Sequence, residues 1–594
     1  MVAGYLPAMF RAAVSVLVLA VVASGCTNSG DDGTSTSPPP SEPSTSSSVT
    51  VATTTTSPAP PDGFGGEIRL GADPALSSLN PFAPDSNGER LAGNAVWAIV
   101  YDIEPDTWDR IPDTVVSLPS QSGGIELNDD GTMTVRYDVD VDARWSDGVS
   151  ITGEDVAFTA EAMRDLALAG EPSVDPIMAN VVGTDVVEQV AFITFSEPSL
   201  AFEDALWIIL PAHALDGVDL VNETDGTDWP SGGPFIVESF DPLGSSSFVR
   251  NELYWKTDDS GRSLPYADRL MIVASAEDGV QANEPISPTA DFVDRSLEVA
   301  AIPPDPRELD QITGISDEGA VLATVPSSIV EHITVQFAGG RDAVNAASLN
   351  DSLDYRTAVA SAIDRDAILE ETGVPWLPDT PGMLIPRIGS AWEQYPFDPE
   401  GAGALIEGLV VEAEDDPAPR PQARLSTTGN GDYRIRIGDA LEQRFEAIGV
   451  DYEPVYLDSV LFFGDTLSAG RFDLGMWAWI SDGGYRSTLD LLDLFDPASE
   501  EVRADLGNWG STESEGAARL SEIAEQARST ADAQEFDELI AEAEQILADE
   551  LVVIPLFNRS SSTAWWGDTV TGIEPNGSRS AVTWNLEEWQ RLDE

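Results

Sequence analysis

The chain has 594 residues, 42% of them hydrophobic, and a net charge of −74 from 104 acidic and 30 basic side chains. The hydrophobic content is sufficient for a large core, whereas the charge would repel nucleic acid and anionic lipid surfaces, so neither is expected as a partner. Lys256 is the only lysine, and no glycine loop precedes it, which excludes a Walker A site. With a single cysteine, no disulfide can form within the chain.

The N-terminal segment predicts export and a membrane anchor. Arg11 precedes an apolar run, residues 12–22, which is too short to span a bilayer and has the length of a signal-peptide core. Small residues follow, and then Cys26, the only cysteine. This order resembles a bacterial lipobox, in which the cysteine becomes the first mature residue and carries acyl chains. The alternative is an ordinary secretory cleavage that leaves an unused thiol.

The next segment is low in complexity. Residues 27–62 are mostly Ser, Thr, Pro, Gly and Asp, and such a stretch buries too little apolar surface to offset the entropy of ordering. We therefore expect residues 1–25 to be a lipoprotein signal peptide and residues 26–62 a disordered tether. The globular part would begin at about residue 63.

The first elements of the globular part are strands. Residues 66–70 are expected to form the first one. Further on, an Asp-Gly pair at 130–131 separates the apolar-containing segments 124–127 and 133–137. This arrangement predicts a β-hairpin, because Asp-Gly favours a tight two-residue turn.

Helices and strands then alternate, which indicates an α/β fold. Thr152 and Asp155 have the spacing of a capping box, so a helix is expected to begin there. Gly449 follows a run of apolar residues at helical spacing and is expected to end that helix. The later elements are expected to be helix 437–448, strand 450–456, helix 536–546 and strand 551–557.

Several motifs, in order along the chain, carry a resemblance to a known family. The best is residues 143–148 (ARWSDG), continuing to Phe158, which is similar to the signature W-S-D-G-x-P-x-T-A-x-D-V. Ser150 replaces the proline and Gly153 the alanine of that signature. The family is that of the extracytoplasmic solute-binding proteins of oligopeptide, dipeptide and nickel ABC importers (family 5). The other matching segments are 79–82 (LNPF), 232–235 (GGPF), 251–255 (NELYW), 356–365 (RTA to AIDR), 395–400 (YPFDPE), 472–477 and 554–556.

The resemblance implies an α/β, two-lobed, periplasmic-binding-protein-like fold of type II, with an extra inserted domain and a ligand cleft between the lobes. Ligand contact with both lobes would shift the population toward a closed form. By analogy, the domains are lobe I (63–106 with 230–330 and 559–594), the inserted family-specific domain (107–229) and lobe II (331–558). The protein would feed a separate permease and ATPase.

Site residues are also carried over from this resemblance. In oligopeptide binders of the family, an aspartate three residues after a tryptophan pairs with the amino group of the peptide, and Trp479 and Asp482 have that relation. A carboxylate in a water-poor cleft is a strong partner for an ammonium group. After Asp482 this chain has Gly-Gly-Tyr-Arg at 483–486, where peptide binders of the family have an aromatic residue and then Asp/Glu-Pro. The remaining expected ligand-binding residues are Trp477, Tyr485, Trp97 and Tyr101.

Other classes of function compete with solute import. An extracellular hydrolase is disfavoured by two histidines, His213 and His332, and by the lack of a Gly-x-Ser-x-Gly motif, although a carboxylate-pair glycosidase stays open. A sensory or scaffolding lipoprotein would bind solute without feeding a permease. We expect no catalytic residues, no cofactor and a monomer that touches the membrane only through its lipid.

Two features of the acidity bear on ligands. The acidic residues are spread along the whole chain, which favours a solvated surface suited to salty surroundings over attraction of a cationic ligand. Asp138, Asp140 and Asp142 alternate as in a calcium loop, but Ala143 and Val149 stand where that loop needs Gly and Glu. No metal site is therefore expected.

Overall fold

The structure is a computed structural model, and it describes most of the chain after residue 64. Residues 1–64, which include Cys26 and the expected signal peptide and tether, lie outside the described residues. The described ranges are 65–72, 78–82, 89–222, 225–241, 245–274, 288–337, 349–377, 382–384, 391–412, 421–429, 432–480, 483–499 and 505–592.

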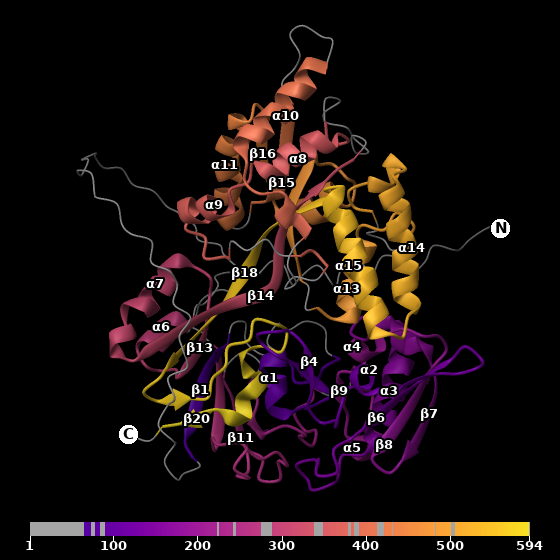
Figure 1. The fold of residues 1–594 in the computed structure, drawn as a ribbon. Helices are drawn as coiled ribbons and strands as arrows, with labels where there is room; N and C mark the ends of the chain where they lie inside the picture. The colour runs from indigo at the N-terminus through magenta and orange to yellow at the C-terminus, as the bar shows by residue number, and fades with distance from the viewer. Residues whose placement is uncertain are drawn as a thin grey trace, which may run out of the picture.

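One ten-stranded sheet runs through both lobes, with the order β10-β11-β12-β1-β13-β18-β14-β17-β15-β16. Figure 1 shows two long strands of this sheet, β14 and β18, crossing from the lower to the upper part of the molecule. The chain therefore has the expected two-lobed α/β fold. The strands of lobe I are β1 (Glu67–Ala72), β10 (Phe235–Ser239), β11 (Ser245–Arg250), β12 (Arg269–Ala274) and β13 (Val299–Ile302); those of lobe II are β15 (Gln422–Thr428), β16 (Asp451–Leu457) and β17 (Leu474–Ile480).

The crossing strands are β14 (Ala320–Val335) and β18 (Val553–Trp566), which pair with each other in antiparallel register. Their pairing is interrupted between Pro326 and Val330, near the middle of β14. On the lobe I side of this interruption β18 pairs with β13, and on the lobe II side β14 pairs with β17. A proline in a paired strand removes a ladder hydrogen bond, so an irregularity at this position is expected.

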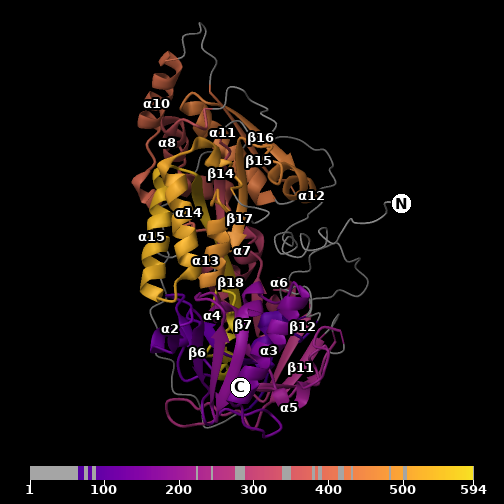
Figure 2. The same cartoon turned by 90° about the vertical axis from the view of Figure 1, so that its right-hand side faces the viewer.

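Helices cover the strands of each lobe, as parallel strands require. Those of lobe II include two long helices, α14 and α15, that extend toward the inserted domain (Figures 1 and 2). Lobe I has α1 (Glu89–Val96), α6 (Thr289–Val293) and α7 (Pro306–Gly314). Lobe II has α8 (Leu353–Ser361), α9 (Arg365–Thr372), α10 (Pro399–Glu412), α11 (Asp432–Ala447), α12 (Ser459–Leu461), α13 (Tyr485–Asp493), α14 (Glu515–Ser529) and α15 (Ala533–Asp549).

The inserted domain is built on a four-stranded sheet, β5-β6-β8-β7, packed against helix α3 (Gly153–Ala169). Thr152 caps α3, and Asp155 completes the predicted capping box by accepting a bond from the Thr152 backbone N–H. The strands are β5 (Ile125–Leu127), β6 (Met133–Asp138), β7 (Val181–Val187) and β8 (Val190–Phe195), and the short helices are α2 (Pro119–Ser122), α4 (Phe202–Ala205) and α5 (Ala212–Leu215).

The best-matching sequence motif forms a turn before α3. The backbone N–H of Gly148 donates to the carbonyl of Trp145 over 2.9 Å, and Gly148 has a φ of 91°, which favours glycine. Asp147 accepts a bond from the Val149 N–H and lies 2.8 Å from Nε2 of His213. The motif therefore shapes the entry to α3, and His213 supports that turn.

Short elements complete the fold. Among the described residues, three two-stranded pairings and several single helical turns occur outside the two larger sheets. The short strands are β2 (Ala98–Ile99) with β9 (Ile208–Ile209), β3 (Tyr101–Ile103) with β4 (Arg110–Pro112), and β19 (Val570–Thr571) with β20 (Gln590–Arg591). The short helices are η2 (Pro176–Asn180), η3 (Ser316–Glu318), η4 (Ala391–Gln394), η5 (Phe462–Leu467, a π-helix), η6 (Trp509–Thr512) and η7 (Val582–Glu588).

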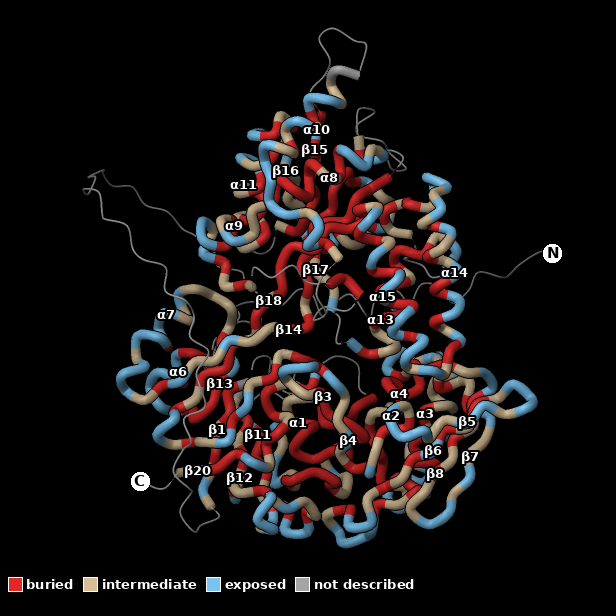
Figure 3. Tube along the Cα trace, viewed as in Figure 1, coloured by how far each residue is buried: buried red, intermediate tan, exposed pale blue. Residues whose placement is uncertain are grey.

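The buried residues follow the crossing strands and continue into both lobes and the inserted domain (Figure 3). Within the described part of the chain, none of the helices combines the length and the apolar character needed to cross a membrane. The fold places a continuous core behind the region where the two lobes meet, which we call the junction.

Candidate functional site

The junction lies where two sets of parallel strands point at each other. In lobe I, β13 ends at Ile302, opposite Ser562 of β18, and in lobe II, β17 ends at Ile480, opposite Ile329 of β14. Both ends therefore point to the middle of the crossing strands. Strands β1 and β12 run parallel to β13, and β15 and β16 run parallel to β17. Ligands of open α/β sheets bind outside the carboxyl ends of such strands, so the junction is the candidate site.

On one side of the junction, Asp204 of α4 is buried among polar groups from lobe I and the inserted domain. Arg110 of β4 donates to its carboxylate at close range, and the Tyr101 hydroxyl lies 3.4 Å from its Oδ1. Arg579 donates to the Tyr101 hydroxyl and lies 3.5 Å from the same Oδ1. One carboxylate is thus shared by two guanidinium groups and a phenol, an arrangement that fixes its position.

Lobe II reaches the same carboxylate through the start of α13. The backbone N–H of Arg486 donates to Oδ2 of Asp204 over 2.5 Å, and the Arg486 side chain lies 3.5 Å from Asp175 of the inserted domain. The guanidinium of Arg110 lies over the ring of Tyr485, 5.1 Å from its centroid. In this structure the two lobes are therefore in contact through charged and aromatic groups.

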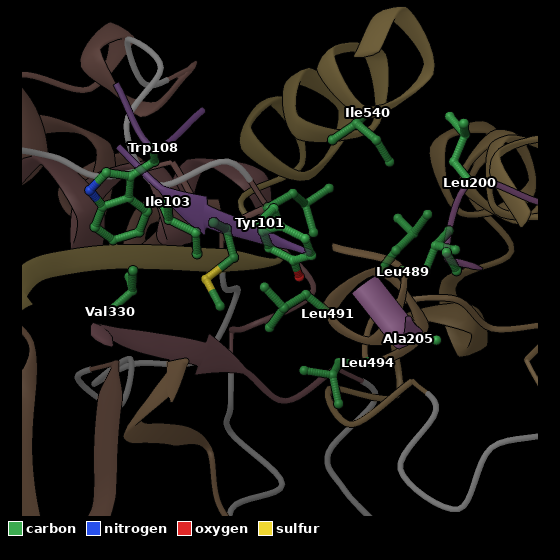
Figure 4. Packing of buried hydrophobic residues seen from close by; sticks show 14 of the residues in the cluster. Tyr101, Ile103, Trp108, Leu200, Ala205, Val330, Leu489, Leu491, Leu494 and Ile540 are labelled. Atoms are coloured by element: carbon green, nitrogen blue, oxygen red, sulfur yellow. The ribbon is translucent and has the colours of Figure 1, made fainter. Parts of the chain in front are cut away.

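Apolar packing surrounds this contact. The buried cluster in Figure 4 includes Tyr101 of β3, Ala205 of α4, and Leu489 and Leu491 of α13. The same cluster contains Trp108 and Val330, which come from the inserted domain and from β14. Side chains of both lobes thus share one core at the junction.

A second charged group lies beside the crossing strands in lobe II. Glu331 of β14 is 1% exposed and accepts hydrogen bonds from Arg434 of α11 and from Arg559 of β18. Burial alone would raise the pKa of Glu331, but the two guanidinium groups outweigh burial and hold the pKa at about 2. Glu331 is therefore ionised at neutral pH and joins α11 to both crossing strands.

Aromatic residues adjoin this group. Arg559 lies over the ring of Trp376, 5.0 Å from its centroid, and Trp376 also packs against Tyr433 and Phe557. The Tyr433 hydroxyl donates to the carbonyl of Pro304, which follows β13 in lobe I. The lobes thus touch here as well as at Asp204.

Lobe I holds a charged group in which acids outnumber bases, and Asp102 is its buried member. Lys256 donates to Asp113 and, over 3.1 Å, to Glu587, and Arg90 lies 3.8 Å from Asp102. Burial raises the pKa of Asp102 to about 7, with neighbouring carboxylates adding to the effect and Arg90 opposing it. Asp102 follows Tyr101 in β3, so this group adjoins the junction.

The predicted ligand-binding residues occupy different environments. Tyr101 belongs to the Asp204 group, and Tyr485 begins α13 and packs on Phe536 with ring centroids 5.0 Å apart. Trp479 is half-buried near the end of β17. Trp477 is 1% exposed, packs edge-on to His332 and Phe472, and also contacts Phe462. Asp482 lies outside the described residues.

Trp97 lies in a different place within lobe I. It lines a crevice with an internal volume of about 20 Å³, together with Trp145 and Trp229, and donates from Nε1 to the carbonyl of Leu79 over 2.9 Å. This volume is enough for a single water molecule. The described residues include no group of three or more His, Cys, Asp or Glu side chains placed to hold a metal ion.

Several junction residues were not identified from the sequence. Asp204, Arg110, Arg579, Glu331 and Arg559 carry no local motif, and only their placement by the fold brings them together. Arg486 had a neighbouring signal, since it follows the predicted residue Tyr485.

Comparisons with known proteins agree with this architecture. Residues 121–497 match the family described as bacterial extracellular solute-binding proteins, family 5 Middle. The oligopeptide-binding protein OppA of Mycobacterium tuberculosis is 24% identical over 511 residues, covering 80% of this chain and 78% of that protein.

Solved structures share the fold at low identity. The substrate-binding protein CtaP of Listeria monocytogenes is 17% identical with a TM-score of 0.67, covering 89% of this chain and 100% of that chain. NikA of Brucella suis in complex with Fe(III)-EDTA is 15% identical with a TM-score of 0.64, covering 89% and 100%. The family match extends over more than half of this chain, so the chain belongs to the bacterial extracellular solute-binding proteins of family 5.

Proposed function

We propose that this protein is a lipid-anchored substrate-binding protein of an ABC importer, which captures a short peptide or a peptide-like compound and delivers it to the membrane permease. The observation that carries the proposal is the meeting of two sets of strand carboxyl ends at the middle of the crossing strands. A ligand in that position touches both lobes, and such a ligand favours the closed form.

The proposed ligand contacts come from both lobes. Trp479 and Tyr485 offer aromatic surface from lobe II, Tyr101 adds a hydroxyl from lobe I, and Asp482 supplies a carboxylate for an ammonium group. Trp477, which is buried behind Trp479 in the same strand, would support the site from beneath.

The peptide class is supported by the relative named as an oligopeptide-binding protein. A structural neighbour solved with Fe(III)-EDTA makes metal chelates the alternative class to test. Native mass spectrometry of the full-length protein, purified in detergent from its own membranes, addresses both. A co-purifying mass that is released on denaturation identifies the ligand class.

Binding is then measured by calorimetry with that ligand or with mixed short peptides. Asp482→Ala is expected to weaken binding of a peptide roughly tenfold to a hundredfold, the usual effect of losing a hydrogen bond to a charged group. Asp259→Ala removes an exposed carboxylate of lobe I and is the matched control. Equal affinities of the two variants would contradict the role of Asp482, and the lack of any bound or binding solute would contradict the proposed function.

The anchor is tested on Cys26. The mass of the mature N-terminal peptide is expected to include acyl chains, and Cys26→Ser is expected to release the protein from the membrane, because several chains are needed for firm anchoring. An unmodified Cys26 in the mature protein would contradict the anchor.

A further inference from the structure

The start of α13 approaches Asp204 more closely than a side chain would allow. A Cβ atom on Gly484 would lie 2.5 Å from Nη2 of Arg110 and 2.8 Å from both carboxylate oxygens of Asp204. Gly484 has a φ of −74°, so the glycine is not required by its backbone conformation. It is required by the close contact between lobe II and the inserted domain.

Asp204 has charged partners on its own side of the junction that do not depend on α13. Its carboxylate is held by Arg110 and Arg579, which both lie on the same side of the junction. When α13 moves away, Asp204 keeps these cationic partners, and water replaces the N–H of Arg486. Separation therefore leaves no unpaired buried charge, the feature that makes the breaking of a buried ion pair costly. The contact is suited to repeated opening.

Other contacts accompany the hydrogen bond from the Arg486 N–H to Asp204. Arg486 also faces Asp175 across the junction and pairs with Asp490 within α13, and Tyr485 lies against Arg110. These contacts lie on the α13 side of the junction, and the lobes meet separately where the Tyr433 hydroxyl donates to Pro304. Rotation of the lobes about the crossing strands would break the contacts at α13, together with the apolar contacts that the two lobes share at the junction.

We propose that Asp204 is a positioning residue that latches α13, and with it lobe II, to the inserted domain, and thereby sets the population of the closed form. The proposal rests on the proposed function only in that closure serves ligand capture. Apparent affinity scales with the fraction of protein in the competent form, so the latch would tune affinity without touching the ligand.

The test measures closure directly, in the full-length chain with Cys26→Ser. Asp259→Cys in lobe I and Glu407→Cys in α10 of lobe II are both exposed positions for a pair of fluorescent dyes. Single-molecule energy transfer then gives the ratio of closed to open molecules without ligand. Asp204→Asn is expected to lower this ratio roughly tenfold or more, as for the loss of a hydrogen bond to a charged group.

Gly484→Ala provides a second variant that leaves the charges of the junction intact and is expected to lower the same ratio. Asp165→Asn, in an exposed pair with Arg164, and Gly464→Ala, with open space around its Cβ position, are the matched controls. The controls should leave the ratio within about twofold, because exposed pairs contribute little.

The latch is overturned if wild-type protein is entirely open without ligand, or if the ratio is unchanged in Gly484→Ala or in folded Asp204→Asn. If Asp204→Asn does not fold, the ratio of closed to open molecules in Gly484→Ala alone decides whether the latch exists. Adding peptides or metal chelates to the wild type separates the two proposals. A ratio that responds to the variants but to no ligand supports the latch and contradicts the proposed function.

Discussion

Lobe II and lobe I each contain a buried carboxylate within a charged group, and the two groups have opposite balances of acids and bases. In lobe II one carboxylate, Glu331, is shared by two arginines, and its pKa is about 2. In lobe I three carboxylates lie with two cations, and the pKa of Asp102 is about 7. Both carboxylates are buried, so burial does not explain the difference. The number of cations for each carboxylate decides whether a buried acid is ionised. The lobe I group consists of Asp102, Asp113, Glu587, Arg90 and Lys256.

The largest loss of stability is expected for Glu331→Gln. Two buried guanidinium groups would lose their shared counter-charge, and the expected loss of stability is about 3–5 kcal/mol. Urea unfolding followed by tryptophan fluorescence measures it. Asp465→Asn, which breaks an exposed pair with Arg471, is the control and should cost little. A loss below that of the control would show that the arginines do not depend on Glu331.

The next largest effect concerns His332, which follows Glu331 in β14. Burial lowers the pKa of His332 to about 4, whereas Glu331 opposes this shift. The unfolded chain binds this proton at about pH 6.5, so stability from the neutral histidine is complete above pH 6.5 and is lost as pH falls to about 4. The full loss is about 3 kcal/mol.

This contribution is isolated by comparing wild type with His332→Phe, which suits the surrounding aromatic cluster. The variant should be less sensitive to acid between pH 6.5 and 4 than the wild type. Parallel stability curves for the two proteins would mean that His332 does not titrate in this range.

Substitution of Lys256 tests the charge balance of the lobe I group. Lys256→Met would leave Asp113 and Glu587 without their shared cation, at an expected cost of about 2 kcal/mol, because Asp113, whose pKa burial raises, can take up a proton instead. The loss should be larger at pH 8 than at pH 5, because Asp113 is more readily protonated at pH 5. Lys256→Arg keeps the charge and is the control; an equal loss in both variants would assign the effect to packing.

The smallest expected effect is that of salt. The net charge of −74 opposes the compact state, and added salt screens this repulsion, so the melting temperature should rise by a few degrees between dilute buffer and about 1 M NaCl. The same rise in KCl would show that screening, not a bound cation, is the cause. A flat or falling curve would mean that the surface charges do not repel strongly.

Local signals predicted many of the elements. The Asp-Gly pair at 130–131 lies in the turn between β5 and β6, and the capping box at Thr152 forms with both of its bonds. Gly449 follows α11 with a φ of 89°, as a stop signal should. Each of these depends on residues a few positions apart, and sequence spacing is sufficient to detect them.

The full length of the crossing strands and the contacts at the junction could not be predicted from local sequence, because they depend on tertiary structure. The predicted strand 551–557 covers only the lobe II half of β18, because the next residues are Asn558, Arg559 and three serines, which do not have the apolar pattern of a strand. Pairing on both edges keeps the other half extended. Asp204 lies 282 residues from Arg486 and 375 from Arg579, so no local pattern could connect them.

The single lysine has a practical consequence. Lys256 offers the only side-chain amine in the chain, and although burial favours its neutral form, Asp113 and Glu587 outweigh burial and hold its pKa well above the usual value. A protonated amine held by two carboxylates is a poor nucleophile. Acylating reagents would therefore react slowly with this side chain in the folded protein, and a faster reaction would report the loss of its two carboxylate partners through local unfolding of lobe I.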